Sequence, residues 1–525
     1  MTSALDRNLA QRVNIGDSLT RSAVLRPDQR AMVDGDRCWT YAEFDGWVNR
    51  LANGLTGLGY ARGDALALAS GNSAEFLAVY YACAKLGVVC VPINLGWRAD
   101  EVIYVLDHSG ARGLVAESQL VTTMAEAAGK VPAVVDLIVA PGTGGESAEG
   151  WRPFESVLAD DASNPQVIVE DRDPISYLYT SGTTSFPKGV VGSHLAIYLE
   201  SMSAALDSGW RADDRFVAML PLFHTAQLNA FVTSAIMVGA TVHLLRAFDA
   251  GTFLATIERE RITQVFGLPM MFRAALDDPS FAHRDLSSLR RAVYAMAPMP
   301  DALIRACLDG FGCDFALLFG QTEMSPIATL FRPEHQLTHI GAVGTALTGV
   351  QVGIMAPDGT LLPAGETGEI VYRAPSVMTE YLRNEQATDE AFAHGWFHSG
   401  DVGRLGADGM LWFADRSKDV IKSGGENVAS IEVEKAIYAA DEGIAEVVVV
   451  GLPHERWSEA ITAVVVPKPG REITADALRE RVRAFLDGYK VPKDVIVVDD
   501  LPRTSTGKIQ KNVLRNQFAD HYRDR

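Results

Sequence analysis

A run of small, hydroxyl-bearing residues that ends in a lysine is the first feature with chemical meaning. The segment 179–190 reads YTSGTTSFPKGV, with Lys188 between Pro187 and Gly189. Its hydroxyls that could donate to phosphate oxygens are those of Thr180, Ser181, Thr183 and Thr184. Small residues also let backbone N–H groups approach phosphate. The run does not fit the common nucleotide loop G-x-x-x-x-G-K-[ST], because Pro187 and Gly189 stand at two of its fixed positions. It predicts a phosphate loop of another kind, with a solvated Ser/Thr/Gly loop as the alternative.

The composition of the chain excludes several classes of partner and setting. The 525 residues carry a formal charge of −19, which disfavours nucleic acid because that partner is bound through Lys and Arg. The five cysteines show no C-x-x-C pair and no disulfide framework, so we expect a reduced, cytoplasmic setting. The N-terminus lacks the apolar core of a signal peptide. The longest apolar region, 76–93, is interrupted by Lys85, Gly87 and Pro92, so no membrane span is expected.

Short apolar runs alternate with helical patterns in the first part of the chain. Residues 65–70 predict a buried strand, 74–87 a helix that ends at glycine, and 88–94 the next strand. The same rhythm recurs at 240–245, 250–261 and 263–269. Strand, helix and strand in this order predict a parallel sheet with covering helices. Residues 141–165 are rich in Gly, Ser and Asp, which predicts a surface loop.

The pattern of predicted secondary structure changes after about residue 340. Short strands with turn signals are predicted at 349–359, 368–374 and 409–416. Beyond Asp419 the pattern predicts a compact α/β unit of roughly a hundred residues. Its expected elements are helices over 430–440 and 475–486 and strands over 445–453, 461–467 and 494–502.

Four further motifs follow the loop at long spacing. They are LFGQTE (318–323), HSGDVG (398–403), ADRSKDVIKSGGENV (414–428) and PRTSTGKIQK (502–511). In this order the five motifs resemble those of the adenylate-forming superfamily, which contains acyl-CoA synthetases, luciferases and peptide-synthetase adenylation domains. The match covers nearly the whole chain. It implies an α/β fold with a large N-terminal adenylation domain (1–417) of parallel-sheet αβ subdomains and a small β-rich subdomain. A small, mobile C-terminal α+β domain (418–525) would pivot at Lys418.

The resemblance implies a ligase that works in two half-reactions. A carboxylate attacks the α-phosphate of ATP in the presence of Mg²⁺ and gives an acyl-adenylate and pyrophosphate; a thiol, usually that of coenzyme A, then displaces AMP. A carboxylic acid is already ionised at neutral pH. The first step therefore needs alignment and charge neutralisation rather than a general base.

The resemblance also assigns nucleotide-binding roles to residues of the motifs. The loop residues that would hold the β- and γ-phosphates are Thr180, Ser181, Gly182, Thr183, Thr184 and Lys188. Thr322 would bond the α-phosphate, and Glu323 would hold Mg²⁺, which favours hard oxygen ligands. Asp401 would accept hydrogen bonds from the ribose hydroxyls, with Arg416 assisting. The residues that would line the adenine pocket are Ala297, Pro298 and Phe319, and Gly320 and Gln321 of the same motif would also contact the nucleotide. Phe319 stands where the family mostly has tyrosine, so stacking is kept and a hydroxyl contact is lost.

Lys508 matches the C-terminal lysine of the family, which reaches the substrate carboxylate and the α-phosphate. A point charge there would offset the charge that develops in the transition state. The pivot at Lys418 would exchange Lys508 for the segment 423–427. The residues expected along the thiol path are Gly424, Gly425 and Trp457. The two glycines leave room for a pantetheine arm. For the tryptophan, a place in the core is the alternative.

Two departures from the family pattern bear on the substrate. Ser185 replaces the usual glycine in the phosphate loop, where a positive φ would cost some strain. Ala295 and Met296 replace both glycines of the usual Gly-Gly-Ala-Pro, and we expect Met296 to reshape or shorten the acyl pocket, unless it turns into the core. The residues matched to this largely apolar pocket are His224, Gln227, Phe266 and Met296. A fatty, aromatic or alicyclic monocarboxylate is the favoured substrate.

The acceptor of the acyl group stays open between two thiols. Coenzyme A is favoured, because no carrier-protein motif follows Lys508, but an external carrier protein is the alternative. A nucleotide-binding protein without catalysis is a third reading, against which the joint presence of Thr322, Glu323, Asp401 and Lys508 argues. The sequence leaves the oligomeric state open, a homodimer included.

Overall fold

The computed structural model describes residues 3–143, 149–180, 187–296, 299–504 and 509–523. Their Cα positions divide the chain into two compact units. Unit 1 holds Met1–Val352 and Tyr372–Phe397, and unit 2 holds Gly353–Val371 and His398–Arg525. Both units combine helices with sheets, so the α/β class predicted from the sequence is confirmed. Among the described residues, no helix is long and apolar enough to cross a membrane.

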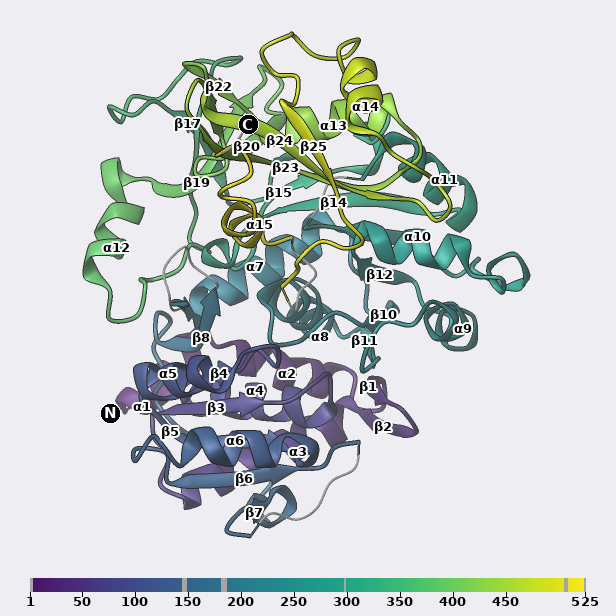
Figure 1. Ribbon diagram of the computed structural model, residues 1–525. Helices are drawn as coiled ribbons and strands as arrows, with labels where there is room; N and C mark the ends of the chain where they lie inside the picture. The colour runs from purple at the N-terminus through teal and green to yellow at the C-terminus, as the bar shows by residue number, and fades with distance from the viewer. Residues whose placement is uncertain (1–2, 144–148, 181–186, 297–298, 505–508, 524–525) are drawn as a thin grey trace. The chain divides into compact units, whose positions relative to one another are not determined.

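A seven-stranded sheet forms the first half of unit 1 (Figure 1). Its strands, in spatial order, are β7 (Arg152–Pro153), β6 (Asp136–Ala140), β5 (Ala111–Glu117), β3 (Ala65–Ala69), β4 (Val89–Pro92), β8 (Pro174–Thr180) and β9 (Lys188–Ser193). Neighbours are parallel except β8 and β9, which pair antiparallel. The predicted strand–helix–strand over 65–94 is confirmed, with α4 (Ala74–Leu86) between β3 and β4. The helix stops where predicted, because Gly87 takes φ +69.

Helices cover both faces of this sheet, as a parallel sheet requires. Leu66 and Leu68 of β3 pack in one cluster with α4 and α3 (Tyr41–Gly57). Ala65, Ala67 and Ala69 point to the other face and pack with α5 (Ala99–Ser109) and α6 (Val121–Ala128). The short run ALALA is therefore apolar at every position because both of its faces are buried.

A nine-stranded sheet forms the second half of unit 1. Its strands, in spatial order, are β16 (Thr345–Ala346), β15 (Ile327–Phe331), β14 (Asp314–Gly320), β13 (Arg291–Tyr294), β12 (Gln264–Gly267), β10 (Arg215–Ala218), β11 (Thr241–Leu244), β1 (Arg30–Asp34) and β2 (Arg37–Thr40). The central strands, from β1 to β14, are parallel. The predicted elements over 240–269 appear as β11, α9 (Ala250–Glu260) and β12.

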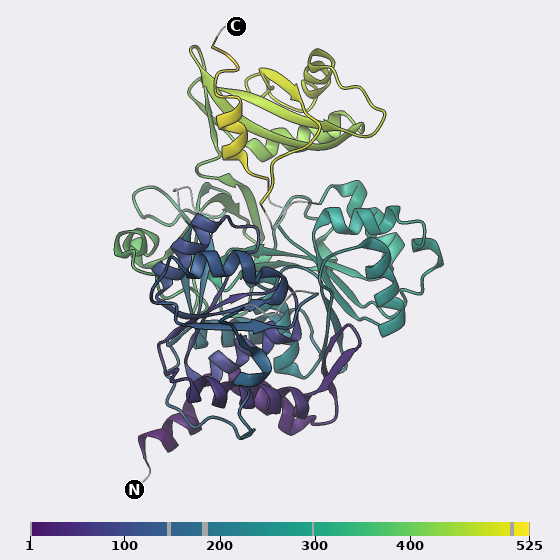
Figure 2. The same ribbon diagram turned by 60° about the horizontal axis from the view of Figure 1, so that its bottom comes forward.

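Helices again lie on both sides of this second sheet. On one side, aromatic rings of α10 (Pro269–Asp277) and α11 (Asp301–Phe311) meet Phe315 of β14 edge to face. These helices and α9 appear in teal beside the strands in Figure 2. On the other side, α7 (His194–Asp207) and α8 (Thr233–Val238) share the cluster that contains alternate residues of β10, β12 and β14. Helix α2 (Ile15–Leu25) joins this cluster, whereas α1 (Ala4–Gln11) buries no residue and α12 (Glu385–Ala391) buries only Ala391.

The surface loop predicted over 141–165 is wrong in its second half. Trp151, Phe154 and Val157 are buried, and β7 adds a strand to the sheet there. The ring of Phe154 lies 5.9 Å from that of Trp47, edge to face. Burial of these large side chains outweighs the loop-like composition around them. Residues 144–148 of this segment lie outside the described residues.

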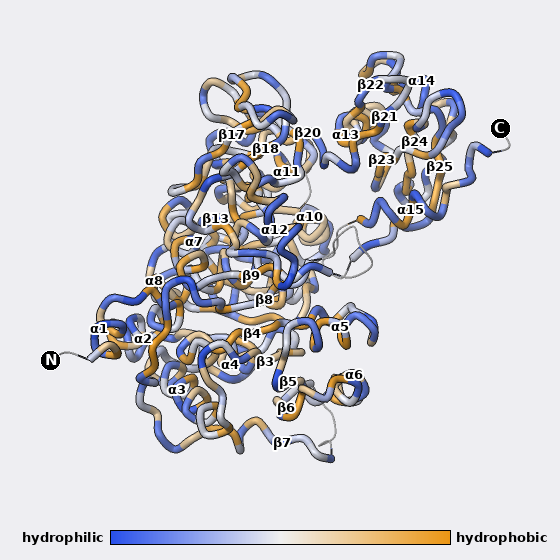
Figure 3. The backbone as a smooth tube through the Cα atoms, turned by 90° about the vertical axis from the view of Figure 1, so that its left-hand side faces the viewer, coloured by the Kyte–Doolittle hydropathy of each residue, from blue (hydrophilic) through white to orange (hydrophobic). Residues whose placement is uncertain are grey.

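Unit 2 contains two smaller sheets. The strands of the first are β17 (Gln351–Met355), β18 (Thr367–Arg373), β19 (Phe397–Leu405) and β20 (Leu411–Arg416). The strands of the second are β22 (Glu426–Val428), β21 (Ile421–Ser423), β24 (Ser458–Pro467), β23 (Ile444–His454) and β25 (Asp494–Val497). The central pair β23–β24 is strongly apolar (Figure 3) and packs under α13 (Ser430–Ala440) and α14 (Ala475–Val482). The predicted elements are present, although α14 and β25 end four and five residues earlier than expected.

Candidate active site

The phosphate loop joins two antiparallel strands of unit 1. Thr180 ends β8, Lys188 begins β9, and these two residues pair with each other in the ladder. The loop residues predicted to bind phosphate, Ser181, Gly182, Thr183 and Thr184, lie outside the described residues, as does Ser185. In the common nucleotide loop a helix follows the strand and its N-terminus attracts the phosphates. Here a second strand follows the loop instead. The observed strand–loop–strand arrangement therefore differs from the common nucleotide loop, in agreement with the sequence pattern, which does not fit that loop.

Tyr381 lies against β9, the strand that follows this loop, and was not singled out from the sequence. The Lys188 ammonium lies over its ring, with Nζ 4.7 Å from the ring centroid. The backbone of Tyr381 forms an antiparallel bridge with Val190 of β9. The tyrosine thus holds the side chain of the phosphate-loop lysine by a cation–π contact.

The Thr-Glu motif follows β14 in a single 3₁₀ turn, Thr322–Met324. Gly320 precedes it at a point of close backbone approach, where a Cβ would overlap the carbonyl oxygen of Pro326. Phe319 and Gln321 flank this glycine and are partly buried. The turn brings the Glu323 carboxylate to Tyr381, whose hydroxyl donates to Glu323 Oε1 at 2.7 Å. Ala297 and Pro298, also predicted for the adenine pocket, lie outside the described residues.

Glu323 meets the chemical requirements of the predicted Mg²⁺ ligand. Magnesium in nucleotide sites is usually held by one or two carboxylates together with phosphate oxygens, rather than by an all-protein cage. Within the described part of the chain, the Glu323 carboxylate accepts a side-chain hydrogen bond from Tyr381 at one of its two oxygens. That bond fixes the orientation of the carboxylate and leaves its second oxygen for a cation.

The residues matched to the acyl pocket differ in their exposure. His224 is partly buried and its Nδ1 accepts from the Ala226 N–H at 3.2 Å. Gln227 and Phe266 are fully buried; Gln227 Oε1 accepts from the Leu220 N–H, and the Phe266 ring stacks on Phe231 at 4.3 Å. Met296 is 39% exposed and takes φ +72. The place of these four residues in an acyl pocket stays a prediction.

A π-helix, Ala226–Val232, begins just after His224. Such helices are rare and are frequently found at functional sites. All seven of its residues are buried, including the polar Gln227 and Asn229. Nothing in the sequence pattern distinguished it from an ordinary helix.

The predicted ribose ligands lie opposite each other in unit 2. Asp401 of β19 pairs with Arg416 of β20, and Arg416 Nε lies 3.1 Å from Asp401 Oδ1. Asp401 is 4% exposed, so this residue is buried within the paired strand β19. Glu369 of the neighbouring strand β18 orients the segment that contains Asp401. Its carboxylate accepts a hydrogen bond from the Gly400 N–H and lies 2.8 Å from His398 Nδ1. Sequence reasoning missed Glu369; the only signal was an acid directly before the apolar run 370–372 of this strand.

The predicted thiol-path residues also meet in unit 2. Gly424 and Gly425 take positive φ values of 63° and 90°. The Gly424 N–H donates to the Trp457 carbonyl at 2.9 Å, and a Cβ on Gly424 would lie 3.0 Å from the indole ring. The structure therefore brings Gly424 next to the half-buried Trp457, whereas a Cβ on Gly425 would meet no atom within 4 Å. The hinge candidate Lys418 is exposed in the turn after β20, and Lys508 lies outside the described residues.

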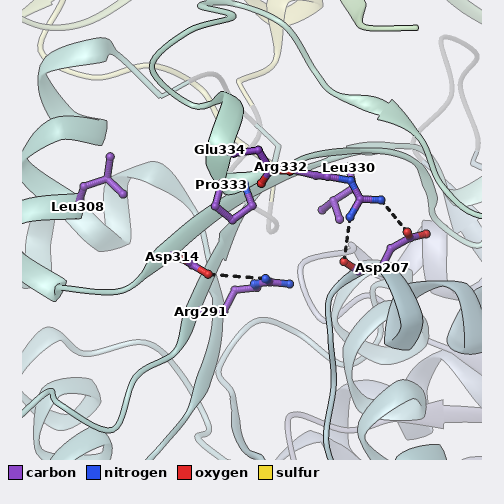
Figure 4. A pocket seen from close by; sticks show the side chains of 8 residues that line it. All are labelled: Asp207, Arg291, Leu308, Asp314, Leu330, Arg332, Pro333 and Glu334. Carbon is purple, nitrogen blue, oxygen red and sulfur yellow. Dashed lines mark hydrogen bonds and ion pairs between the residues drawn. The ribbon is translucent and has the colours of Figure 1, made fainter. Parts of the chain in front are cut away.

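One cavity of unit 1 lies apart from all these residues (Figure 4). Its volume is ≈ 390 Å³, and its lining includes Arg291, Asp314 and Arg332. Arg291 and Asp314 begin the parallel strands β13 and β14, whereas Gly320 ends β14. The cavity is thus at the strand edge opposite the Thr-Glu motif, and both arginines are engaged by Asp314 and Asp207.

Comparison with known proteins places the chain in one family. Residues 19–382 match the AMP-binding enzyme family and residues 432–508 match the AMP-binding enzyme C-terminal domain. A feruloyl-CoA synthase of an Amycolatopsis species is 36% identical over 506 residues, 96% of this chain and 99% of that protein. The long-chain-fatty-acid–CoA ligase FadD13 of Mycobacterium tuberculosis is 36% identical over 508 residues, with the same coverage.

Solved structures agree with this assignment. ATP-bound MatB from Rhodopseudomonas palustris superposes with a TM-score of 0.89 at 28% identity, covering 98% of this chain and 100% of MatB. The fold, the motifs and the full-length relatives thus lead to one conclusion: the chain belongs to the AMP-binding enzyme family, as one of its acyl-CoA ligases.

Proposed function

We propose that the chain activates a fatty, aromatic or alicyclic monocarboxylate with ATP and Mg²⁺ and transfers the acyl group to coenzyme A. The observation that carries this proposal is the arrangement around Tyr381. One tyrosine holds the phosphate-loop lysine on its ring and the Glu323 carboxylate on its hydroxyl. A cation for phosphate and a carboxylate for a metal are thereby kept close together, as metal-assisted phosphoryl chemistry needs.

The first half-reaction forms the acyl-adenylate. A carboxylate oxygen of the acid attacks the α-phosphorus, the bond to the bridging oxygen breaks, and pyrophosphate leaves. Lys188 and the loop hold the leaving pyrophosphate, Thr322 orients the α-phosphate, and Asp401 with Arg416 binds the ribose. Bound Mg²⁺ supplies positive charge to the phosphate oxygens. Lys508 offsets the charge on the reacting carboxylate and α-phosphate.

The second half-reaction transfers the acyl group to a thiol. The thiol sulfur attacks the acyl carbon, its proton passes to solvent, and AMP leaves with the bonding electron pair. Trp457 supports coenzyme A as the thiol, because two cations lie over its ring: Arg456 at 4.8 Å and Lys493 at 4.7 Å. Burial lowers the pKa of Lys493, and the positive charges of Arg479 and Arg483 lower it further. Such a local excess of positive charge suits the phosphate-rich nucleotide end of coenzyme A.

The reaction is tested by measuring pyrophosphate release over a panel of acids, with and without coenzyme A. We expect release with at least one monocarboxylate and a stoichiometric loss of free thiol when coenzyme A is present. Pyrophosphate release without any thiol consumption would instead favour a carrier protein as the acceptor. If no acid released pyrophosphate, nucleotide binding without catalysis would become the better account.

A substitution at Met296 tests the acyl pocket. We expect Met296→Gly to raise kcat/KM for bulkier acids about tenfold relative to smaller ones, because a side chain at the pocket wall is removed. The melting temperature should not fall, since the left-handed backbone of Met296 costs a non-glycine residue about 1–2 kcal/mol, which glycine avoids. The measurements are kcat/KM over a graded acid series and a thermal melt.

Met296→Ala is the matched control for this substitution. Alanine removes the bulk of the side chain but keeps the Cβ that disfavours φ +72. Both variants should show the same change in acid preference, with Met296→Gly the more stable of the two. An unchanged ranking of acids in both variants would remove Met296 from the pocket.

A further inference from the structure

The segment that follows Ser376 is hydrogen-bonded on one side to the phosphate-loop strand and on the other to the Thr-Glu turn. The Thr379 N–H donates to Val191 O, the Val191 N–H to Glu380 O, and the Leu382 N–H to Gly189 O. The Met378 N–H donates to the carbonyl of Glu323 at 2.7 Å. The short segment Met378–Leu382 therefore links β9 to Glu323 through its backbone alone.

The side chain of Tyr381 forms a second connection between β9 and Glu323, through its ring and its hydroxyl. Its hydroxyl donates to Glu323 Oε1 at 2.7 Å, and its ring lies beneath Lys188 Nζ at 4.7 Å. The same side chain thus contacts an ammonium with the face of its ring and a carboxylate with its hydroxyl. A further restraint comes from the backbone, because the Tyr381 N–H donates to Thr388 Oγ1 at 3.0 Å.

We propose that Tyr381 is a positioning residue that keeps Lys188 and Glu323 from pairing with each other and orients each for a different part of magnesium-bound ATP. This inference rests on the proposed function. The cation–π contact occupies none of the three N–H donors of the lysine, so all of them stay available for phosphate oxygens. The hydroxyl engages one carboxylate oxygen and leaves the other for the metal.

The two parts of the side chain make separable contributions. Loss of the hydroxyl alone releases the Glu323 carboxylate, so it weakens the metal and not the phosphates. Partners that orient a metal ligand typically contribute about 10- to 100-fold to metal affinity. Loss of the ring also lets Lys188 pair with Glu323, so it weakens the phosphates as well.

Calorimetric ATP binding tests this division without relying on turnover. With Tyr381→Phe we expect the Mg²⁺ concentration at half-maximal enhancement of ATP binding to rise about tenfold. The Kd for ATP without metal should stay within about twofold, because the phenyl ring still carries Lys188. With Tyr381→Leu both quantities should rise. Tyr381→Phe in a Glu323→Gln background should have no further effect on the metal dependence, because the two residues act as one unit.

Tyr41→Phe is the matched control. It also removes one tyrosine hydroxyl, whose hydrogen bond goes to Ala240 O at 2.6 Å in the core, away from the loop. Its Mg²⁺ dependence should equal that of the wild type, even if its melting temperature falls. A metal dependence of Tyr381→Phe that matches this control, in a wild type that binds ATP and releases pyrophosphate, overturns the role of Tyr381 alone. A wild type that does neither overturns the proposed function as well.

Discussion

Replacing Lys508 with alanine is expected to slow acyl-adenylate formation, with a loss of about 10²–10³-fold in kcat. The expected loss corresponds to removing one preorganised donor at developing charge. Thioester formation from preformed acyl-adenylate and coenzyme A should change less than about threefold, because that step uses other residues of unit 2 in the proposed mechanism. The two steps are measured separately, by pyrophosphate release and by loss of free thiol from added acyl-adenylate.

The residues that flank Lys508 explain why the effect should be confined to this side chain. Arg503 and Ile509 form an antiparallel bridge, and the Gln510 N–H donates to Pro502 O at 2.8 Å. Arg503 is ion-paired with Glu446 of β23. Both ends of the motif are thus fixed on unit 2 independently of Lys508, so alanine at this position should leave the fold intact.

Lys511→Ala is the neighbouring control. Lys511 Nζ donates to Ser430 Oγ and to Glu434 at 2.9 Å, and burial raises the pKa of that glutamate. Removing this lysine leaves a buried acid without its cation, so the melting temperature should fall while the ratio of the two half-reaction rates stays unchanged. Equal losses of both half-reactions in Lys508→Ala would contradict a role limited to adenylation.

Replacing Asp401 with alanine is expected to raise the Kd for ATP about 10²- to 10⁴-fold. Each hydrogen bond to a charged acceptor contributes about 1.5–3 kcal/mol, and two ribose hydroxyls would lose theirs. In this variant Arg416 faces an uncharged alanine on β19, and the pairing of β19 with β20 places no other acidic residue opposite it. Binding is measured by calorimetry at constant magnesium.

A nucleotide analogue makes this prediction specific to the ribose. The wild type should bind ATP more tightly than 2′-deoxyATP, and Asp401→Ala should bind the two almost equally, because a site built for a hydroxyl rejects a ligand that lacks it. Asp408→Asn, at the turn of the same β19–β20 hairpin, is the control and should keep the wild-type preference. Persistent discrimination in Asp401→Ala would show that another residue reads the ribose.

The elements that could be predicted from the sequence are those whose burial and turns are local. The run 65–94 was recognisable because both faces of β3 are apolar and Gly87 stops the helix with a positive φ. The strands β23 and β24 were recognisable because each contains a run of consecutive valines. Their boundaries were less certain, as the early ends of α14 and β25 show.

The residues of the candidate site also fall into those that the sequence could predict and those that it could not. Motif residues such as Asp401 and Arg416 could be named in advance, and the ladder indeed places them opposite each other. Tyr381 could not, because its importance comes from a pairing with Val190, almost two hundred positions earlier in the sequence. Glu369 likewise acts through the backbone of Gly400 on a neighbouring strand. Contacts set by strand register leave little trace in a single sequence.

The pairing of Thr180 with Lys188 has a consequence for how this loop can vary between related enzymes. A ladder that closes immediately on both sides of a loop fixes the exit direction of the chain, whatever lies between. Residues could be inserted, removed or exchanged there while Lys188 kept its side of the sheet, provided that β9 did not slip by one position. Such a slip is opposed by the hydrogen bonds that Gly189 and Val191 make with Leu382, Thr379 and Glu380. We therefore expect that the residues between Thr180 and Lys188 can be replaced by the corresponding phosphate-binding sequence of another family member.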